Sequence, residues 1–189
     1  CFNIVEIDVR QTKDGVPVVL HDSSANRTTD GRGEIKEMNY VDVCKLDAGS
    51  WSNPFFAGEP VPRLEDVLTH VKGSLGVYIA INAAEPEIRF ELVQRFDMFR
   101  DCFFWCKDIK VMDKLRLLNK DVRLMARRYD FPTLKDVIER HNPQVVEFDG
   151  LKFTNKELKY CKELGILSMP YYTGSKLSVL KKLIDSGAD

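Results

Sequence analysis

The sequence lacks several features that define large classes of protein. No apolar run among its 189 residues approaches the roughly 20 residues that a transmembrane helix needs. Its 28 Lys and Arg nearly balance its 29 Asp and Glu, so the net charge is −1. This balance gives no electrostatic case for a nucleic-acid partner or an anionic membrane surface. No low-complexity segment or flexible linker interrupts the chain, so a single domain over residues 1–189 is expected.

Cysteine and histidine are both scarce. The five cysteines are an odd number and are scattered, which does not suggest a disulfide framework. Cys102 and Cys106 lie close together, but no second pair follows to complete a zinc site, so buried thiols are expected. His70 and His141 fall near the expected C-termini of helices, where an imidazole suits the helix dipole. They are interpreted as structural, which leaves His21 as the candidate for chemistry.

A regular alternation of strands and helices begins near residue 60. Short apolar runs predict buried strands over 76–82, 102–106, 122–127, 144–150 and 166–172. Amphipathic segments predict helices over 63–71, 87–96, 109–119, 133–141, 154–165 and 176–187. The helix at 154–165 has a capping box from Thr154 to Glu157 and a stop signal at Gly165. The alternation predicts parallel βαβ units, and therefore an α/β barrel or a doubly wound sheet.

The first 60 residues depart from this alternation. Residues 3–22 predict two strands joined by a Lys-Asp-Gly turn at 13–15. The chain opens directly into the first of these strands and shows no signal peptide, so the compartment stays open. Residues 22–62 are rich in Gly, Asp, Asn, Ser and Pro and have weak periodicity. An irregular insertion of this length beside a regular scaffold is usually functional.

Four side chains of the insertion allow two interpretations each. Trp51, Phe55 and Phe56 would line a pocket for a lipid head group or glycerol, or pack the insertion onto the scaffold. Arg27 would contact a phosphate, although tethering of the loop is the favoured interpretation.

The first strand carries two carboxylates on one face. Residues i and i+2 of a strand point the same way, so Glu6 and Asp8 share a face and the apolar residues between them take the other. Two carboxylates about 7 Å apart repel each other unless a cation lies between them, and a divalent ion with oxygen ligands is the natural partner. His21 closes the next strand, and an imidazole there suits acid–base chemistry. A surface hairpin with solvated carboxylates would show the same spacing.

Three segments in this order resemble the glycerophosphodiester phosphodiesterase family: VEIDVRQTKDGVPVVLHDSSANRTTDGRGEI, LDAGSW and FAGEPVPRLEDVL. The resemblance implies a TIM-type (β/α)₈ barrel with its site at the C-terminal ends of the strands. It also implies a divalent metal, Ca²⁺ or Mg²⁺, and hydrolysis of a small glycerophosphodiester to an alcohol and glycerol phosphate. Both carboxylates of the family's E-x-D motif bind the metal, which here means Glu6 and Asp8. The His of its H-D motif, here His21, is one of two catalytic histidines.

The sequence departs from the family pattern in three places. The family's first strand carries an H-R-G motif, which supplies the other catalytic His and a phosphate-binding Arg, and no such motif occurs here. A last strand near T-D is also missing, so six barrel strands stand where eight are expected. We therefore expect this chain to be part of a longer barrel, rather than a short chain closed by a partner. On the third strand, I-E-I-K is replaced by IAIN, in which Ala80 cannot bind metal and Asn82 carries no charge.

Two functions are consistent with these observations. The first is a metal-dependent phosphodiesterase whose metal binding is weak, with His21, Asp22 and Glu147 as the places to look for a replacement ligand. The alternative is a catalytically degenerate relative that binds phosphoester or protein ligands without turnover. Ala80 and Asn82 are the residues that separate the two. The sequence indicates neither the alcohol nor the oligomeric state.

Overall fold

The computed structural model describes residues 3–82 and 86–189. The chain divides into two compact units, Cys1–Lys120 and Asp121–Asp189. Cys1, expected to be a buried thiol, lies outside the described residues. The expectation of one barrel domain over residues 1–189 stays a prediction.

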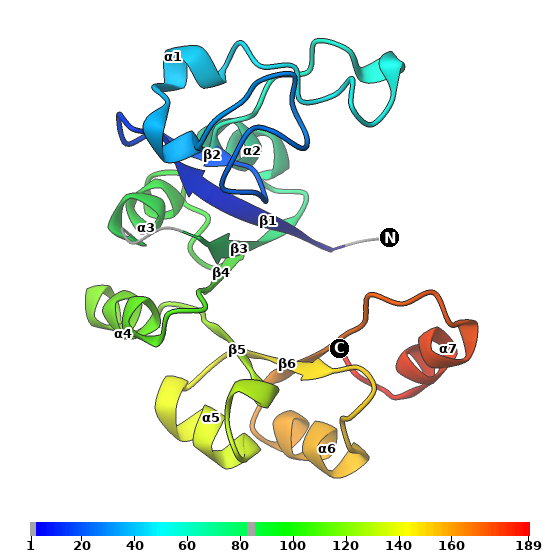
Figure 1. Cartoon of the computed structure of the whole chain (residues 1–189). Coiled ribbons are helices and arrows are strands. Elements are labelled where there is room, and N and C mark those ends of the chain that lie inside the picture. Colours follow the sequence, from blue (N-terminus) through cyan, green and yellow to red (C-terminus); the bar gives the residue numbers. More distant parts are fainter. Residues whose placement is uncertain (1–2, 83–85) are drawn as a thin grey trace. The chain divides into compact units, whose positions relative to one another are not determined.

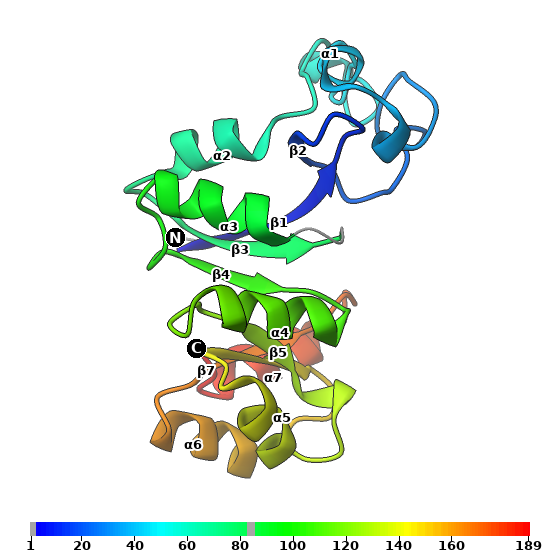
Figure 2. The same cartoon turned by 90° about the vertical axis from the view of Figure 1, so that its left-hand side faces the viewer.

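A four-stranded sheet with the order β2-β1-β3-β4 forms the centre of the first unit. β1 (Ile4–Gln11) and β2 (Pro17–Val19) are the predicted antiparallel hairpin, whose turn ends on Gly15 with a φ of 85°. β3 (Gly76–Ile81) runs parallel to β1 and beside it, and β4 (Cys102–Trp105) runs parallel to β3 on its other side (Figure 2). Each of these two parallel strands ends one residue before its predicted range does.

Both faces of β3 and β4 are buried. On one face, Phe90 of α3 (Pro86–Arg95) lies 6.3 Å from Phe104 of β4, measured between ring centroids. On the other face, the rings of Tyr78 and Phe103 stack at 4.9 Å on neighbouring strands. Burial on both faces explains the continuous apolar sequence of β3, as expected for a parallel strand.

Two further helices belong to the first unit. α2 (Leu64–Val71) and α4 (Ile109–Leu118) match their predicted ranges to within one residue. His70 is exposed in the last turn of α2, where the sequence placed it.

The irregular insertion has a small core of its own. It contains η1 (Ile35–Glu37), the short helix α1 (Tyr40–Val43) and η2 (Pro54–Phe56). Six buried residues from β2, the segment after it and the insertion pack together: Val18, Leu20, Ala25, Ile35, Val43 and Val61. These apolar positions are too widely spaced to show a period, which is why the sequence did not reveal the core.

The second unit is a three-stranded parallel sheet with the order β5-β6-β7. β6 (Val145–Asp149) and β7 (Leu167–Tyr171) lie within the predicted ranges. β5 (Met125–Arg127) is three residues shorter than predicted at its start. The difference arises because the backbone N–H of Leu124 donates to the side-chain oxygen of Gln144 at 2.9 Å, instead of to a neighbouring strand.

Helices cover one face of this second sheet. α5 (Leu134–His141) and α6 (Asn155–Glu163) enclose a core with one face of β5 and β6. The buried members of this core are Ala126, Leu134, Val137, Val146, Phe148, Phe153, Leu158, Cys161 and Ile166. α7 (Leu177–Asp185), drawn in red in Figure 1, is the last helix of the described residues and follows β7 (Figure 2).

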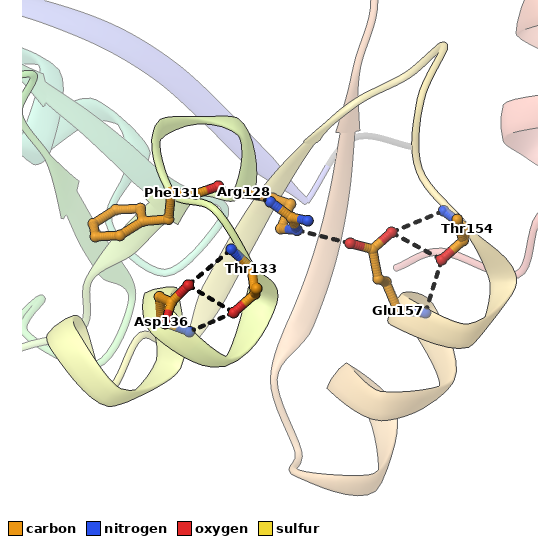
Figure 3. Close-up of polar contacts among 6 residues, drawn as sticks. All are labelled: Arg128, Phe131, Thr133, Asp136, Thr154 and Glu157. Carbon is orange, nitrogen blue, oxygen red and sulfur yellow. Dashed lines mark hydrogen bonds and ion pairs between the residues drawn. The ribbon is translucent and has the colours of Figure 1, made fainter.

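Capping side chains fix where the helices of the second unit begin. Thr154 and Glu157 form the predicted capping box at the start of α6, and Thr133 and Asp136 form an equivalent one at α5 (Figure 3). Arg128 links the α6 box to the turn before α5, because it donates to Glu157 at 2.7 Å and to the carbonyl of Phe131 at 2.9 Å. α6 ends at Glu163 with Leu164 as its C-cap, so the predicted stop at Gly165 is confirmed.

That stop has a clear backbone cause. Gly165 follows the C-cap of α6 with a φ of 69°, a conformation that glycine adopts without steric cost. His141 ends α5 and is buried edge-on against Phe131, as a structural histidine would be.

Six parallel strands are thus present in the described residues, as predicted, in two sheets that do not close into a complete barrel. Each helix of the described residues is too short or too polar to cross a membrane.

Candidate active site

Glu6 and Asp8 occupy alternate positions on β1. Glu6 is paired in register with Tyr78, and Asp8 with Ala80. The intervening Ile7 is buried on the opposite face. Since register partners point to the same face of a sheet, both carboxylates are on the face that carries the Tyr78 ring and not on the face covered by α3. Glu6 is exposed there and Asp8 is half-buried.

Asn82 contacts Asp8 directly. Its side-chain Nδ2 donates to Asp8 Oδ1 at 2.6 Å. Ala80 is buried between Asp8 and Trp105, its register partners on the two neighbouring strands. Ala80, at the position where the family has a Glu, is therefore next to Asp8. The position where the family has a Lys holds a neutral amide that supplies one N–H to Asp8.

Arg10 holds His21 beside this pair, a role that the sequence reasoning missed. Its guanidinium donates to the backbone carbonyl of His21 at 3.1 Å through Nε, and to the carbonyl of Asn82 at 3.3 Å. The N–H of Leu20 donates to the carbonyl of Asp8 at 3.0 Å. Arg10 lies two residues after Asp8, so alternation along the strand places it on the same face of β1. This spacing could have identified Arg10 as a site residue from the sequence.

Asp22 fixes the side chains of His21 and Arg27. Its Oδ1 lies 2.7 Å from His21 Nδ1, and both of its oxygens accept from Arg27, at 2.6 and 2.8 Å. The hydrogen bonds from Arg27 and then from His21 hold the pKa of the Asp22 carboxyl well below its usual value. The favoured interpretation of Arg27 as a tether agrees with these contacts. The His21 side chain is 74% exposed, so its other ring nitrogen is accessible.

Two residues considered as replacement metal ligands are engaged elsewhere. Asp22 is bound as described, and Glu147 is buried on β6. Glu147 forms an ion pair with Arg127, whose Nε lies 3.1 Å from its Oε1, and accepts a hydrogen bond from the hydroxyl of Tyr129. Burial, reinforced by the Glu147 carboxylate, raises the pKa of Tyr129. In the part of the chain that the structure describes, no three side chains of His, Cys, Asp or Glu gather as a metal site would require.

Each unit has a cavity at the ends of its strands. In the first unit a cavity of about 660 Å³ is lined by Arg10 and Asn82 of the site and also by Lys13 and Lys36. In the second unit a cavity of about 500 Å³ is lined by residues that end or follow β5, β6 and β7. They are Tyr129, Asp149, Leu151, Lys152, Tyr171, Tyr172 and Thr173. Tyr171 and Tyr172, at the end of the last strand of this unit, thus line a cavity.

These parallel βα units place the chain among TIM-barrel proteins. The crystal structure of a glycerophosphodiester phosphodiesterase from Agrobacterium tumefaciens is similar over 99% of this chain and 81% of its own length. The TM-score is 0.92 and the identity 29%. An Oleispira antarctica phosphodiesterase, solved in complex with the product sn-glycerol-3-phosphate, matches over 99% of this chain and 79% of its own with a TM-score of 0.85. Its identity of 21% supports the fold alone.

The sequence profile of the Glycerophosphoryl diester phosphodiesterase family matches residues 2–118, and the chain belongs to this family. A Bacillus subtilis glycerophosphodiester phosphodiesterase is 40% identical over 41% of this chain. The chain spans 29% of the length of that relative and 37% of the B. subtilis protein YhdW, to which it is 39% identical. The fold class and the family expected from the sequence are therefore confirmed.

Proposed function

We propose that the protein containing this chain hydrolyses glycerophosphodiesters to an alcohol and glycerol phosphate. The observation that carries the proposal is the network that joins Asp8 to the backbone of His21 in a chain of this family. Glu6 and Asp8 share a face of β1, and Arg10 ties the backbone of His21 to that of Asn82, whose side chain holds Asp8. This network lies towards the C-terminal ends of β1 and β3, the end of the strands at which barrels place their sites.

Glu6 and Asp8 are the residues that would hold a divalent ion. Their hard oxygen ligands fit Ca²⁺ or Mg²⁺, but these ions take six or more oxygens, so two carboxylates are a partial set. Asn82 occupies one oxygen of Asp8 at 2.6 Å, which orients the carboxylate and leaves Oδ2 for the ion. When bound, such an ion polarises the phosphoryl oxygens of a phosphodiester. We expect weak binding because Ala80 adds no ligand.

His21 is the proposed proton donor. The short contact of its Nδ1 with the ionised Asp22 fixes the ring with an N–H towards that carboxylate. Nε2 is then the atom that exchanges protons with the substrate. In the proposed step, a water oxygen forms a bond to phosphorus while the bond from phosphorus to the alcohol oxygen breaks. The proton on Nε2 passes to the departing alcohol oxygen, and the attacking water gives its proton to a second base, the role that the family resemblance assigns to the other histidine of the pair.

The cavity of about 660 Å³ lies beside this network, at Arg10 and Asn82. Its lining combines the cations of Arg10, Lys13 and Lys36 with the carboxylates of Asp14 and Glu34, which leaves an excess of one positive charge for a phosphodiester with one negative charge. The volume lies in the range of ordinary small-molecule sites.

Replacement of His21 by Ala tests the proposal, with His70→Ala as the matched control because His70 is also exposed and lies at the end of α2. The assay is hydrolysis of glycerophosphocholine by the whole protein, with Ca²⁺, with Mg²⁺ and with a chelator. We expect His21→Ala to abolish turnover and His70→Ala to retain it. A folded wild type that turns over no phosphodiester would reject the proposal in favour of the degenerate relative.

A further inference from the structure

An exposed loop within the insertion carries three aromatic side chains. We call residues 47–60 the aromatic loop. Trp51 is 55% exposed, Phe55 is 88% exposed and Phe56 is 50% exposed. The two Phe rings pack edge to face at 5.7 Å. In Figure 1 the loop is part of the cyan segment between α1 and α2, and it extends away from the sheet of the first unit.

The loop is closed and held by its own hydrogen bonds. Asp47 forms an isolated bridge with Pro60, and the N–H of Ala48 donates to the carbonyl of Glu59 at 2.7 Å. Gly49 lets the two limbs meet, because a Cβ there would lie 1.9 Å from the carbonyl oxygen of Phe56. The aromatic side chains are therefore presented on a preformed turn.

The polar groups of the turn are largely satisfied inside it. Asp47 accepts from the backbone N–H groups of Gly49, Ser50 and Gly58 at 2.9 to 3.0 Å. The hydroxyl of Ser50, which also donates to Asp47, is the main reason that the pKa of Asp47 lies well below its usual value, and the backbone bonds add to the effect. The side chain of Asn53 accepts from the N–H of Phe55 at 2.9 Å.

The indole of Trp51 is satisfied in the same way, since its Nε1–H donates to the carbonyl of Ala48 at 2.9 Å. A segment can enter an apolar medium when its polar groups have internal partners, because no water is available there. The groups nearest the rings, Asp47, the Asn53 oxygen and the indole N–H, therefore have internal partners, while the charged Glu59 lies at the end of the loop next to Pro60.

The exposed area of the aromatic loop favours a lipid layer over a protein partner. An aromatic side chain presents about 150–250 Å², so the exposed fractions amount to on the order of 400 Å². A stable protein interface needs roughly 800 Å² on each partner. A convex loop of about half that area is small for a protein partner or a second copy, whereas a few inserted aromatic rings suffice at a lipid surface.

We propose that the aromatic loop inserts into the surface of a neutral phospholipid layer and holds the protein at that surface. Charge plays little part, because Arg27, whose guanidinium lies 5.9 Å from the centre of the Trp51 ring, is already paired with Asp22. Binding should therefore persist at high salt. The inference goes beyond the phosphodiesterase activity, and its test does not use turnover.

The test is co-sedimentation of the whole protein with phosphatidylcholine vesicles, at low and high salt. A Phe ring moved from water into lipid is worth roughly 10- to 100-fold in partitioning, so Phe55→Ala should weaken binding at least about tenfold. Leu117→Ala is the matched control, because Leu117 on α4 is 87% exposed in the same unit. Both residues are on the surface, so neither change should unfold the protein.

Fluorescence of Trp51 gives a second measurement. Vesicles should shift its emission to shorter wavelength, and Trp51→Phe should remove this shift, because Trp105 is buried. The proposal is wrong if the wild type does not bind vesicles or if Leu117→Ala weakens binding as much as Phe55→Ala does. It is also wrong if salt abolishes binding or if the fluorescence shift survives Trp51→Phe.

Discussion

Replacing Asn82 by Ala isolates the contact that distinguishes this chain from the family pattern. The change removes the N–H that Asp8 accepts at 2.6 Å but keeps the backbone carbonyl that Arg10 binds. A hydrogen bond to a charged group contributes about 1.5–3 kcal/mol to stability. Asp8 is half-buried and water will replace part of the bond, so we expect a loss of about 1–2 kcal/mol in the free energy of unfolding.

The same change should weaken the site. Groups that orient a metal-binding carboxylate are typically worth about 10–100-fold in metal affinity or activity. Asn39→Ala is the control, because Asn39 is exposed at the start of α1 and its side chain makes no capping hydrogen bond. Calorimetry with Ca²⁺ and Mg²⁺ measures the metal affinity, denaturant unfolding measures the stability, and glycerophosphocholine turnover measures the activity. Equal values for Asn82→Ala and Asn39→Ala would refute the assignment of Asn82 as the residue that orients Asp8.

Three further predictions concern other contacts. Thr154→Ala should lower the free energy of unfolding by about 1 kcal/mol through loss of the cap on α6, whereas Thr173→Ala in an exposed loop should not, as denaturant titration would show. Burial raises the pKa of Glu157, but hydrogen bonds from Arg128 and Thr154 outweigh burial and lower the pKa below 4.5. The ionised Glu157 side chain therefore stabilises the fold above that pH, and this contribution is lost as the pH falls. The destabilisation by Glu157→Gln should therefore shrink between pH 7 and pH 3, and a constant difference would contradict this. Ala80→Glu together with Asn82→Lys should raise phosphodiesterase activity about tenfold or more, and a slower double variant would show that the site depends on Ala80.

The repeating part of the fold follows from local sequence. Apolar runs and amphipathic spacing placed the strands and helices after residue 60, and the box of Thr154 and Glu157 placed the start of α6. The start of β5 was wrong because it depends on Gln144, a residue 20 positions away whose side chain takes the N–H of Leu124. Long-range competition of this kind leaves no trace in local spacing.

The candidate site was partly predictable for the same reason. Alternation along β1 gave the shared face of Glu6 and Asp8, but their partners lie far along the chain. Asn82 is 74 residues from Asp8, and Arg10 is 11 residues from His21. The resemblance to the family drew attention to Asn82 as a departure from a charged residue, whereas its contact with Asp8 required the parallel pairing of β1 with β3.

The central claim is that Asp8 and His21 act in one phosphodiesterase site. Its most direct test is ³¹P NMR of glycerophosphocholine incubated with the whole protein and Mg²⁺ or Ca²⁺, for wild type and Asp8→Asn. We expect a glycerol phosphate signal to grow with wild type and to grow at least about 100-fold more slowly with Asp8→Asn. Unchanged product formation by Asp8→Asn would contradict the claim.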